Sequence, residues 1–301
     1  MKIYKNISDN IPEGSVVSVG FFDGVHLGHK YLIEKLKDIG KQYNSPTMII
    51  TMWPHPLTIL KNQNIKLLTS QDEKNKIFEK MGIDTLLILN FNKELASINA
   101  RNFIDGTLTN NIKAKVLLKG FNNSFGKDAG NNFIPDTERI KIITADKFLL
   151  NNSVSVNSTK IRNYLDAGDI KSATELLGYN YKIKGTIKEA YKIGRKIGFP
   201  TANLTGIDKN KLIPGNGVYI IQANINDNWL PAMLNIGNRP TFGHFDKTLE
   251  FHILDFNDKI YNKEIEIRFL KKLRDEKKFD NVHCLIKQLK QDKKTTKDYF
   301  C

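Results

Sequence analysis

The sequence predicts a doubly wound α/β domain followed by an antiparallel β-barrel. Its length of 301 residues favours roughly two domains. The first half alternates short apolar runs with helical stretches, which is the pattern of a parallel sheet flanked by helices. The last third has short alternating segments punctuated by Gly, Asn and Pro, which favours antiparallel strands closed into a barrel.

Four apolar runs in the first half are expected to form buried strands, at 16–20, 47–52, 85–90 and 115–119. Between them, apolar residues recur at three-to-four spacing, which predicts helices over 29–40, 72–81 and 99–108. Strands that alternate with helices in this way build a doubly wound parallel sheet.

A further helical stretch, 158–177, is broken at Gly168 and Asp169, and the pattern changes after residue 180. We therefore expect one domain over 1–180 and a second over 181–301. Barrel strands are predicted over 217–225, 230–237, 248–256 and 264–270, and a closing helix over 279–290.

Composition indicates a folded protein, since 40% of residues are hydrophobic and 26% are charged. No apolar run reaches the roughly 18 residues that span a bilayer, and the first residues lack the apolar core of a signal peptide. A cytoplasmic protein is expected. The two cysteines, Cys284 and Cys301, do not form the close-spaced pair of a zinc or redox site, so they are expected to be free thiols.

The net charge of +14 is compatible with nucleic acid, an anionic membrane or polyanionic small substrates as partners. Lysines are spread along the chain beside Asn and Ile, so a coding bias explains the charge equally well. No helix-turn-helix, zinc finger or aromatic RNA-binding motif accompanies it. Small-molecule substrates are therefore the expected partners, with neither nucleic acid nor membrane, and the oligomeric state stays open.

The first candidate site is the segment from Gly20 to His29, between a predicted strand and a predicted helix. Its backbone amides, together with His26 and His29, lie near a helix N-terminus, where phosphate is favoured. Gly28 allows close backbone approach. The two imidazoles can donate hydrogen bonds to the α- and β-phosphates of ATP as charge develops during attack at the α-phosphorus. The alternative is a pair of surface histidines, and the strand-to-helix position favours phosphate binding.

Two further segments carry phosphate-binding chemistry. Ser158, Thr159 and Arg162 offer hydroxyl and guanidinium donors at a predicted helix start, although spacing alone favours an ordinary helix cap. The second segment combines flexible glycines with two oxygen donors suited to Mg²⁺ and phosphate, and its residues are Gly185, Gly194, Arg195, Gly198, Phe199, Pro200, Thr201 and Asn203. It lacks the P-loop pattern. A glycine-rich turn of the barrel is the alternative.

The run FDGVHLGH over 22–29 resembles the nucleotidylyltransferase superfamily, and in particular the bacterial bifunctional riboflavin kinase/FAD synthetase family. The string GRKIGFPTANL over 194–204 resembles the riboflavin kinase domain of that family. Other matching segments follow in the family's order, at 54–56, 120–122, 125–127, 158–162, 217–219, 235–237, 239–242 and 249–252. The resemblance is collinear over nearly the whole chain.

For the first domain the resemblance implies a nucleotidylyltransferase-like, Rossmann-like fold with FMN adenylyltransferase activity. His26 and His29 would stabilise the ATP phosphates, and Ser158, Thr159 and Arg162 would clamp phosphate. Asn122 would line the nucleotide and flavin pocket. Further nucleotide-binding residues are expected in the same loop and beside it: Gly20, Phe21, Phe22, Asp23, Gly24, Gly28 and His55. His55 lies between two prolines, and a purely structural role is an equal alternative for it.

For the second domain the resemblance implies a riboflavin kinase barrel. Thr201 and Asn203 would hold Mg²⁺ with ATP, and Glu250 would accept the proton of the ribityl 5′-hydroxyl. A carboxylate suits this task, because a loose phosphoryl-transfer transition state requires orientation and modest proton acceptance. Arg274 and Phe279 would lie near the flavin, with a solvated helix face as the alternative.

The expected function is therefore flavin cofactor biosynthesis with two reactions. Riboflavin and ATP would give FMN, and FMN and ATP would give FAD and pyrophosphate. Asn157, Phe21 and Trp53 depart from the family pattern in the first domain, and Ala190 departs from it in the second. One alternative is that a single activity survives. Another is a silent flavin-binding or nucleic-acid-binding protein.

Overall fold

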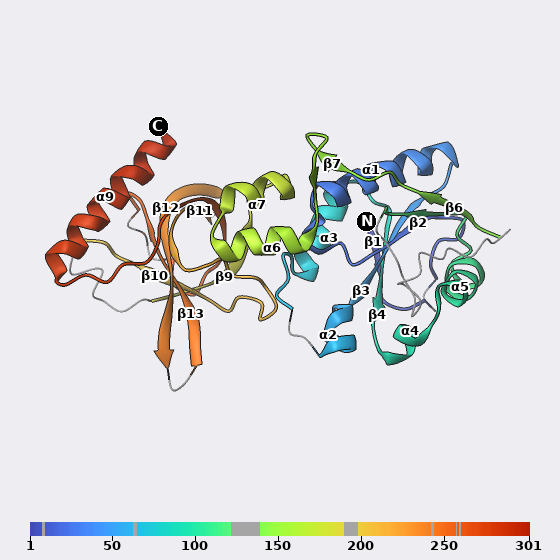
Figure 1. The fold of residues 1–301 in the computed structure, drawn as a ribbon, viewed down its shortest axis with the longest axis horizontal. Helices are drawn as coiled ribbons and strands as arrows, with labels where there is room; N and C mark the ends of the chain where they lie inside the picture. Colours follow the sequence, from blue (N-terminus) through green and yellow to red (C-terminus); the bar gives the residue numbers. More distant parts are fainter. Residues whose placement is uncertain are drawn as a thin grey trace. The chain divides into compact units, whose positions relative to one another are not determined.

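A computed structural model of the chain describes residues 1–7, 10–62, 65–121, 139–189, 198–241, 244–256, 258 and 260–301. Its internal contacts divide the chain into two compact units, Met1–Asn157 and Ser158–Cys301, whose elements are labelled in Figure 1. Among the residues described, no helix combines the length and the apolar character needed to cross a membrane.

The first unit contains a parallel sheet, in the order β1-β4-β3-β2-β5-β6. Its strands are β1 (Lys2–Tyr4), β2 (Val16–Val19), β3 (Thr47–Trp53), β4 (Thr85–Asn90), β5 (Val116–Lys119) and β6 (Lys141–Thr144). The four strands predicted from apolar runs are its four central strands. The two edge strands, β1 and β6, were not predicted, because their partly exposed residues form no continuous apolar run.

The helical elements of this unit are η1 (Asp23–Val25), α1 (Leu27–Gln42), α2 (Pro56–Lys61), α3 (Gln71–Lys80), α4 (Lys93–Ser97), α5 (Ala100–Asn102) and η2 (Phe103–Asn111), and a short hairpin follows the sheet as β7 (Leu149–Leu150) and β8 (Val154–Ser155). The predicted helices at 29–40 and 72–81 correspond to α1 and α3. The stretch predicted at 99–108 is α5 continued by the π-helical turns of η2.

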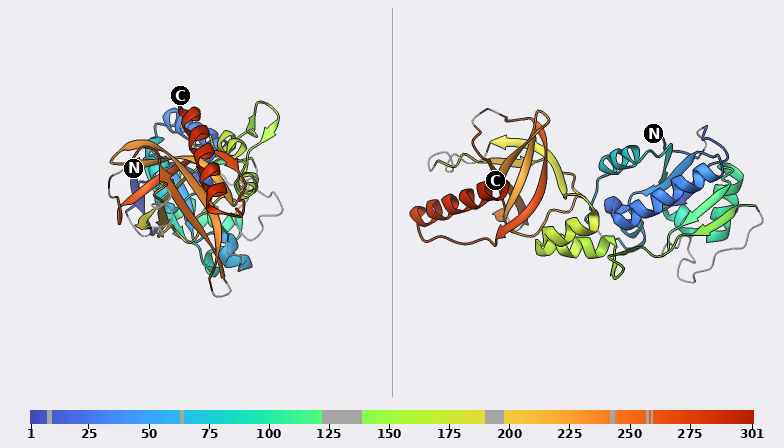
Figure 2. Two further views of the ribbon diagram at one scale, coloured as in Figure 1. Left: turned by 90° about the vertical axis from the view of Figure 1, so that its left-hand side faces the viewer. Right: turned by 90° about the horizontal axis from the view of Figure 1, so that it is seen from above.

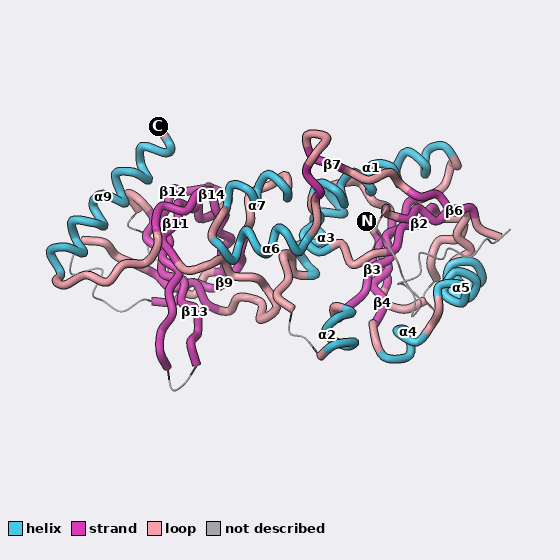
Figure 3. The backbone as a smooth tube through the Cα atoms, viewed as in Figure 1, coloured by secondary structure: helices cyan, strands magenta, loops and turns pink. Residues whose placement is uncertain are grey.

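Separate apolar cores cover the two faces of the sheet. On one face Ile50 and Leu87 pack with Ile104 of η2. On the other face Ile49 packs with Leu36 of α1, in a core that also includes α3. Successive strand residues point to opposite faces, so helical segments cover both, and Figure 3 distinguishes these helices from the strands by colour. The doubly wound α/β prediction is confirmed.

The second unit contains a closed antiparallel barrel, in the order β10-β13-β12-β11-β14-β9. Its strands are β9 (Lys182–Glu189), β10 (Ala202–Thr205), β11 (Gly217–Ile225), β12 (Asn228–Thr241), β13 (His244–Ile253) and β14 (Glu264–Arg274). The predicted barrel is confirmed. Of these strands, β9 and β10 flank the glycine-rich segment and were not predicted.

Among the residues that the structure describes, the barrel is accompanied by α6 (Ser158–Ala167), α7 (Ile170–Leu177) and α9 (Val282–Phe300). In Figure 2, α9 runs along the outside of the barrel, where it contacts β12. The expected boundary after residue 180 assigned α6 and α7 to the first domain. Their contacts group them with the barrel instead, because α7 packs on β14 and Gly215 N donates a hydrogen bond to Leu165 O at 2.9 Å.

Candidate active sites

The first site is the loop between β2 and α1, which carries both predicted histidines. His26 is the N-cap of α1, and its Nδ1 accepts a hydrogen bond from His29 N at 3.3 Å. The two imidazole rings stack, with centroids 3.6 Å apart and an interplanar angle of 14°. The structure therefore brings His26 and His29 together at a helix N-terminus, where anions are favoured.

Hydrogen bonding and burial determine the protonation of this pair. Because His26 Nδ1 accepts a backbone hydrogen bond, the neutral ring carries its proton on Nε2. Burial, and to a smaller extent the charges of His26 and Lys74, hold the pKa of His29 well below its usual value of 6.5. His29 Nδ1 is shielded from solvent and has no hydrogen-bond partner among the described residues. His29 is consequently a neutral hydrogen-bonding group at neutral pH.

The loop adopts an unusual backbone that neighbouring groups hold in place. Phe22 and Val25 have positive φ values of 55° and 33°, in the left-handed region that costs non-glycine residues energy. The Asp23 carboxylate accepts hydrogen bonds from Leu68 N at 2.9 Å and Thr69 N at 3.2 Å. Gly24 N donates to Thr69 Oγ1 at 3.0 Å. Asp23, which was expected to bind nucleotide, is buried and bonds the loop to the segment before α3.

Phe22 and Gly20 also shape the loop from within the protein. The Phe22 ring is buried, and its centroid lies 5.2 Å from that of His29. A Cβ at Gly20 would lie 3.0 Å from the Phe22 ring, so a larger residue there would require this ring to shift. Both residues were expected to bind nucleotide. In the structure Phe22 packs on His29, and Gly20 leaves space for the Phe22 ring.

Lys74 of α3 is a fully buried residue of this site that sequence reasoning missed. Its Nζ donates a hydrogen bond to Phe21 O at 3.2 Å and lies 4.2 Å from the centroid of the Phe21 ring. Burial lowers the pKa of Lys74 to about 8, and Asp23 opposes this shift. The sequence does contain a sign that Lys74 is buried. Lys74 is four residues before the core residue Phe78, so the two share the inward face of α3.

His55 and Gly28 complete the described part of this site. The His55 ring lies 4.2 Å from the Phe21 ring, centroid to centroid, in an edge arrangement. His55 Nδ1 also accepts a hydrogen bond from Leu57 N at 3.1 Å, as the N-cap of α2. A Cβ at Gly28 would lie 3.3 Å from the His26 ring and 3.7 Å from Val156 O. Asn122 lies outside the described residues.

Ser158, Thr159 and Arg162 lie in the first turns of α6, which begins at Ser158 as predicted. Ser158 and Arg162 are four residues apart and therefore share one face of that helix. These residues belong to the second unit, and their contact with the phosphates at His26 stays a prediction.

The second site lies where β10, β13 and β12 pair on the barrel. Asn203 is directly opposite Glu250, which is directly opposite Asn235. Residues opposite each other in antiparallel strands share one face of the sheet. The adjacent row, Ala202, Phe251 and Leu234, is buried in the barrel, so the polar row lies on the outer face. Asn203 Oδ1 is buried without a hydrogen-bond partner among the described residues.

The segment before β10 carries the remaining described residues of this site. Gly198 has φ of +81°, which glycine adopts without strain, and Phe199 is buried against Met233 and Leu254. Pro200 O contacts His252, a residue that was not among the predicted site residues. Gly185 lies elsewhere, on β9, where a Cβ would meet Thr205 O at 2.7 Å, so strand packing requires that glycine. Gly194, Arg195 and Ala190 lie outside the described residues.

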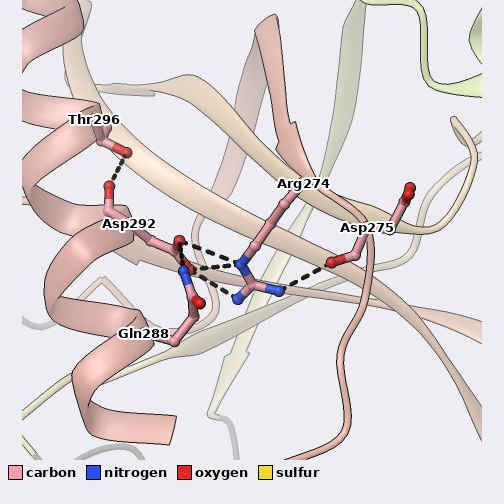
Figure 4. Close-up of polar contacts among 5 residues, drawn as sticks. All are labelled: Arg274, Asp275, Gln288, Asp292 and Thr296. Carbon is pink, nitrogen blue, oxygen red and sulfur yellow. Dashed lines mark hydrogen bonds and ion pairs between the residues drawn. The ribbon is translucent and has the colours of Figure 1, made fainter. Parts of the chain in front are cut away.

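Arg274 was expected near the flavin, which stays a prediction, and its guanidinium also holds α9 (Figure 4). Its Nη2 and Nε bond the Asp292 carboxylate, with an Nη2–Oδ2 distance of 2.8 Å, and its Nη1 donates to Asp275 O at 3.0 Å. Asp292 is largely buried, with 6% of its side chain exposed. Gln288 Nε2 also donates to Asp292 Oδ1, at 2.9 Å. Arg274 thereby anchors the C-terminal helix to the end of β14.

Asp292→Ala is expected to lower the free energy of unfolding of the second unit by about 3 kcal/mol, because it leaves a largely buried guanidinium without its carboxylate. Urea unfolding followed by circular dichroism measures this loss. Asp298→Ala, an exposed site on the same helix, is the matched control and should leave stability unchanged. Equal stability of the two variants would show that the ion pair does not anchor α9.

A candidate phosphate-binding loop in an α/β domain and a candidate phosphate- and metal-binding face on a barrel indicate a class of enzyme that transfers nucleotidyl and phosphoryl groups. The family models agree: the FAD synthetase model matches residues 8–159 and the riboflavin kinase model matches residues 177–300. The chain belongs to the bifunctional riboflavin kinase/FMN adenylyltransferase family. It is an enzyme of flavin cofactor biosynthesis that phosphorylates riboflavin to FMN and adenylylates FMN to FAD.

Relatives of the same description cover nearly the full chain. The bifunctional riboflavin kinase/FMN adenylyltransferase of Listeria monocytogenes is 35% identical, over 95% of this chain and 92% of the relative. That of Escherichia coli is 31% identical, over 98% and 96%. A crystal structure described as a macrolide-efflux protein from Streptococcus pneumoniae has a TM-score of 0.89 and 29% identity, covering 98% of each chain. The two-domain architecture is therefore shared along the whole length.

Proposed function

We propose that the loop between β2 and α1 performs adenylyl transfer and that the outer face of β10, β13 and β12 performs riboflavin phosphorylation. The main support for the kinase site is that Asn203 lies directly opposite Glu250 in the pairing of β10 with β13. This register places a candidate ligand of phosphate and metal, Asn203, next to a candidate base, Glu250. The stacked pair of His26 and His29 supports the other half.

In adenylyl transfer, an oxygen of the FMN phosphate attacks the α-phosphorus of ATP and pyrophosphate leaves. His26 donates from Nε2, and the neutral His29 ring donates beside it, to the phosphate oxygens where charge develops. Ser158, Thr159 and Arg162 bind phosphate, and Asn122 binds in the nucleotide and flavin pocket. No covalent enzyme intermediate forms, so these residues act through positioning and charge stabilisation.

In the kinase reaction, Glu250 accepts the proton of the ribityl 5′-hydroxyl as that oxygen takes the γ-phosphoryl group of ATP and ADP leaves. Thr201 and Asn203 would hold Mg²⁺, since hydroxyl and amide oxygens suit this cation. The buried Asn203 Oδ1, which lacks a hydrogen-bond partner among the described residues, fits such a ligand. When bound, the ion supplies positive charge to the phosphates of ATP.

Anionic small substrates also account for the basic composition. ATP and FMN both carry phosphate, so a chain with a net charge of +14 attracts them electrostatically. The cytoplasmic location and the absence of nucleic-acid and membrane partners remain predictions from the sequence.

A time course with riboflavin, ATP and Mg²⁺ tests the proposal, with the three flavins separated chromatographically. FMN that rises and then gives way to FAD is the expected result. FMN without FAD would contradict the adenylyltransferase site. FAD from added FMN, with no FMN made from riboflavin, would contradict the kinase site. A protein that makes neither product would contradict both.

A further inference from the structure

His252 lies beside the proposed kinase base and contacts the proposed metal-binding segment. It is two residues after Glu250 on β13, so both side chains point to the outer face of the barrel. The His252 residue is 7% exposed, and its ring meets the Phe199 ring edge-on, with centroids 5.5 Å apart. Phe199 in turn packs in a cluster with Leu289 of α9. The imidazole is thus enclosed between the barrel and the segment that precedes β10.

One ring nitrogen of His252 makes a short hydrogen bond to that segment, since Nδ1 lies 2.8 Å from Pro200 O. A carbonyl oxygen can only accept, so His252 Nδ1 carries a proton and donates it. Burial lowers the pKa of His252, partly offset by this hydrogen bond, so the ring is neutral at neutral pH and its Nε2 is unprotonated. Nε2 is itself buried and has no hydrogen-bond partner among the described residues.

The hydrogen bond between His252 and Pro200 lies outside the paired residues of β10 and β13. The pairing of β10 with β13 begins at Ala202 and Phe251, so Pro200 and Thr201 precede it. Pro200 has no backbone N–H and can bond only through its carbonyl oxygen. That oxygen is the atom that His252 holds. The position of Thr201 relative to Glu250 therefore depends on a side chain as well as on strand pairing.

We propose that His252 is a positioning residue of the kinase site. Its Nδ1–H holds Pro200 O, and this contact maintains the position of Thr201 relative to Glu250. The inference rests on the proposed kinase site, where the separation between base and phosphate-binding residues sets the reaction geometry. Groups that orient ligands in this way commonly change affinity or activity by about 10- to 100-fold when they are removed.

Two substitutions separate hydrogen bonding from packing. His252→Asn places an amide nitrogen near the position of Nδ1, and so retains the donor while losing ring volume. His252→Phe retains a ring against Phe199 and loses the donor. If His252 positions Thr201 through its hydrogen bond to Pro200, the kcat for FMN formation should fall by about 10- to 100-fold in the Phe variant. The kcat of the Asn variant should stay close to that of the wild type. FAD formation from added FMN should be unchanged in both and serves as the internal control.

Binding of ADP in the presence of Mg²⁺, measured by titration calorimetry, supplies a readout apart from turnover. It should weaken by about 10-fold in the Phe variant and be unchanged in the Asn variant. Equal losses in both variants, or full activity of His252→Phe, would overturn the inference. If His252→Phe does not fold, His252→Leu replaces it, and a folded Asn variant without kinase activity would also overturn the inference. Wild-type protein that makes no FMN would instead contradict the proposed kinase site.

Discussion

His29→Ala is expected to reduce FAD formation from FMN by at least about 100-fold, which is the usual effect of removing one donor that stabilises transition-state charge. His29 lies at the N-terminus of α1 and stacks on His26 at 3.6 Å, so the substitution removes both a donor and the support of its neighbour. FMN formation from riboflavin should not change. Separate assays with FMN and with riboflavin measure the two rates.

The matched control for this experiment is His283→Ala, which removes an exposed histidine of α9 and should change neither rate. If the folded His29→Ala protein formed FAD at the wild-type rate, the loop between β2 and α1 would not be the adenylyltransferase site. If it lost both activities while remaining folded, the two sites would not be independent.

Glu250→Gln is expected to reduce FMN formation by about 100- to 10,000-fold, the range for loss of a general base, and to leave FAD formation from FMN intact. Gln retains the size of the side chain opposite Asn203 and Asn235 and removes the proton acceptor. The loss should appear mainly in kcat, because riboflavin binding does not require proton transfer. Steady-state kinetics with riboflavin as the varied substrate separates kcat from KM.

Glu264→Gln is the control for the base, since Glu264 lies on another barrel strand and pairs with Lys184 at the surface. Its kinase rate should match that of the wild type. A Glu250→Gln protein that still phosphorylated riboflavin at the normal rate would exclude Glu250 as the base. If Glu250→Gln also lost FAD formation from FMN, its effect would not be confined to the kinase site.

Local sequence pattern predicted the elements whose burial is unambiguous. Strands β2, β3, β4 and β5 lie inside the sheet, so most of their residues are apolar. Such a continuous apolar run can be recognised in the sequence without knowing which strands pair with it. The edge strands β1 and β6 have exposed residues, and their strand character depends on hydrogen bonds to β4 and β5. For the same reason the short strand β10, which alternates between buried and partly buried residues, was read as part of a glycine-rich loop.

The residues of the candidate sites also fall into two groups, those expected from the sequence and those that only the folded structure reveals. Motif spacing indicated His26, His29 and Asn203 as candidates, because the residue types that bind phosphate or a metal ion are readable from the chain itself. Glu250 was expected as the base only from the resemblance to the family. Arg274 was recognised by resemblance, and its pairing with Asp292 was not, since these residues are 18 positions apart and meet only when α9 packs on the barrel. Lys74 was not predicted as a site residue, because its burial against Phe21 depends on how α3 packs in the folded protein.

The buried central strands, the two domain types and the chemistry of the motifs thus follow from the chain alone, because hydrophobic periodicity and residue identity are local properties. The pairing of Asn203 with Glu250, the bond from His252 to Pro200 and the contact of Lys74 with the histidine loop do not follow from it. They depend on strand register and on side-chain packing between segments that are 47 to 53 residues apart in sequence. Such long-range contacts are selected by burial in the folded state, and no local pattern encodes them.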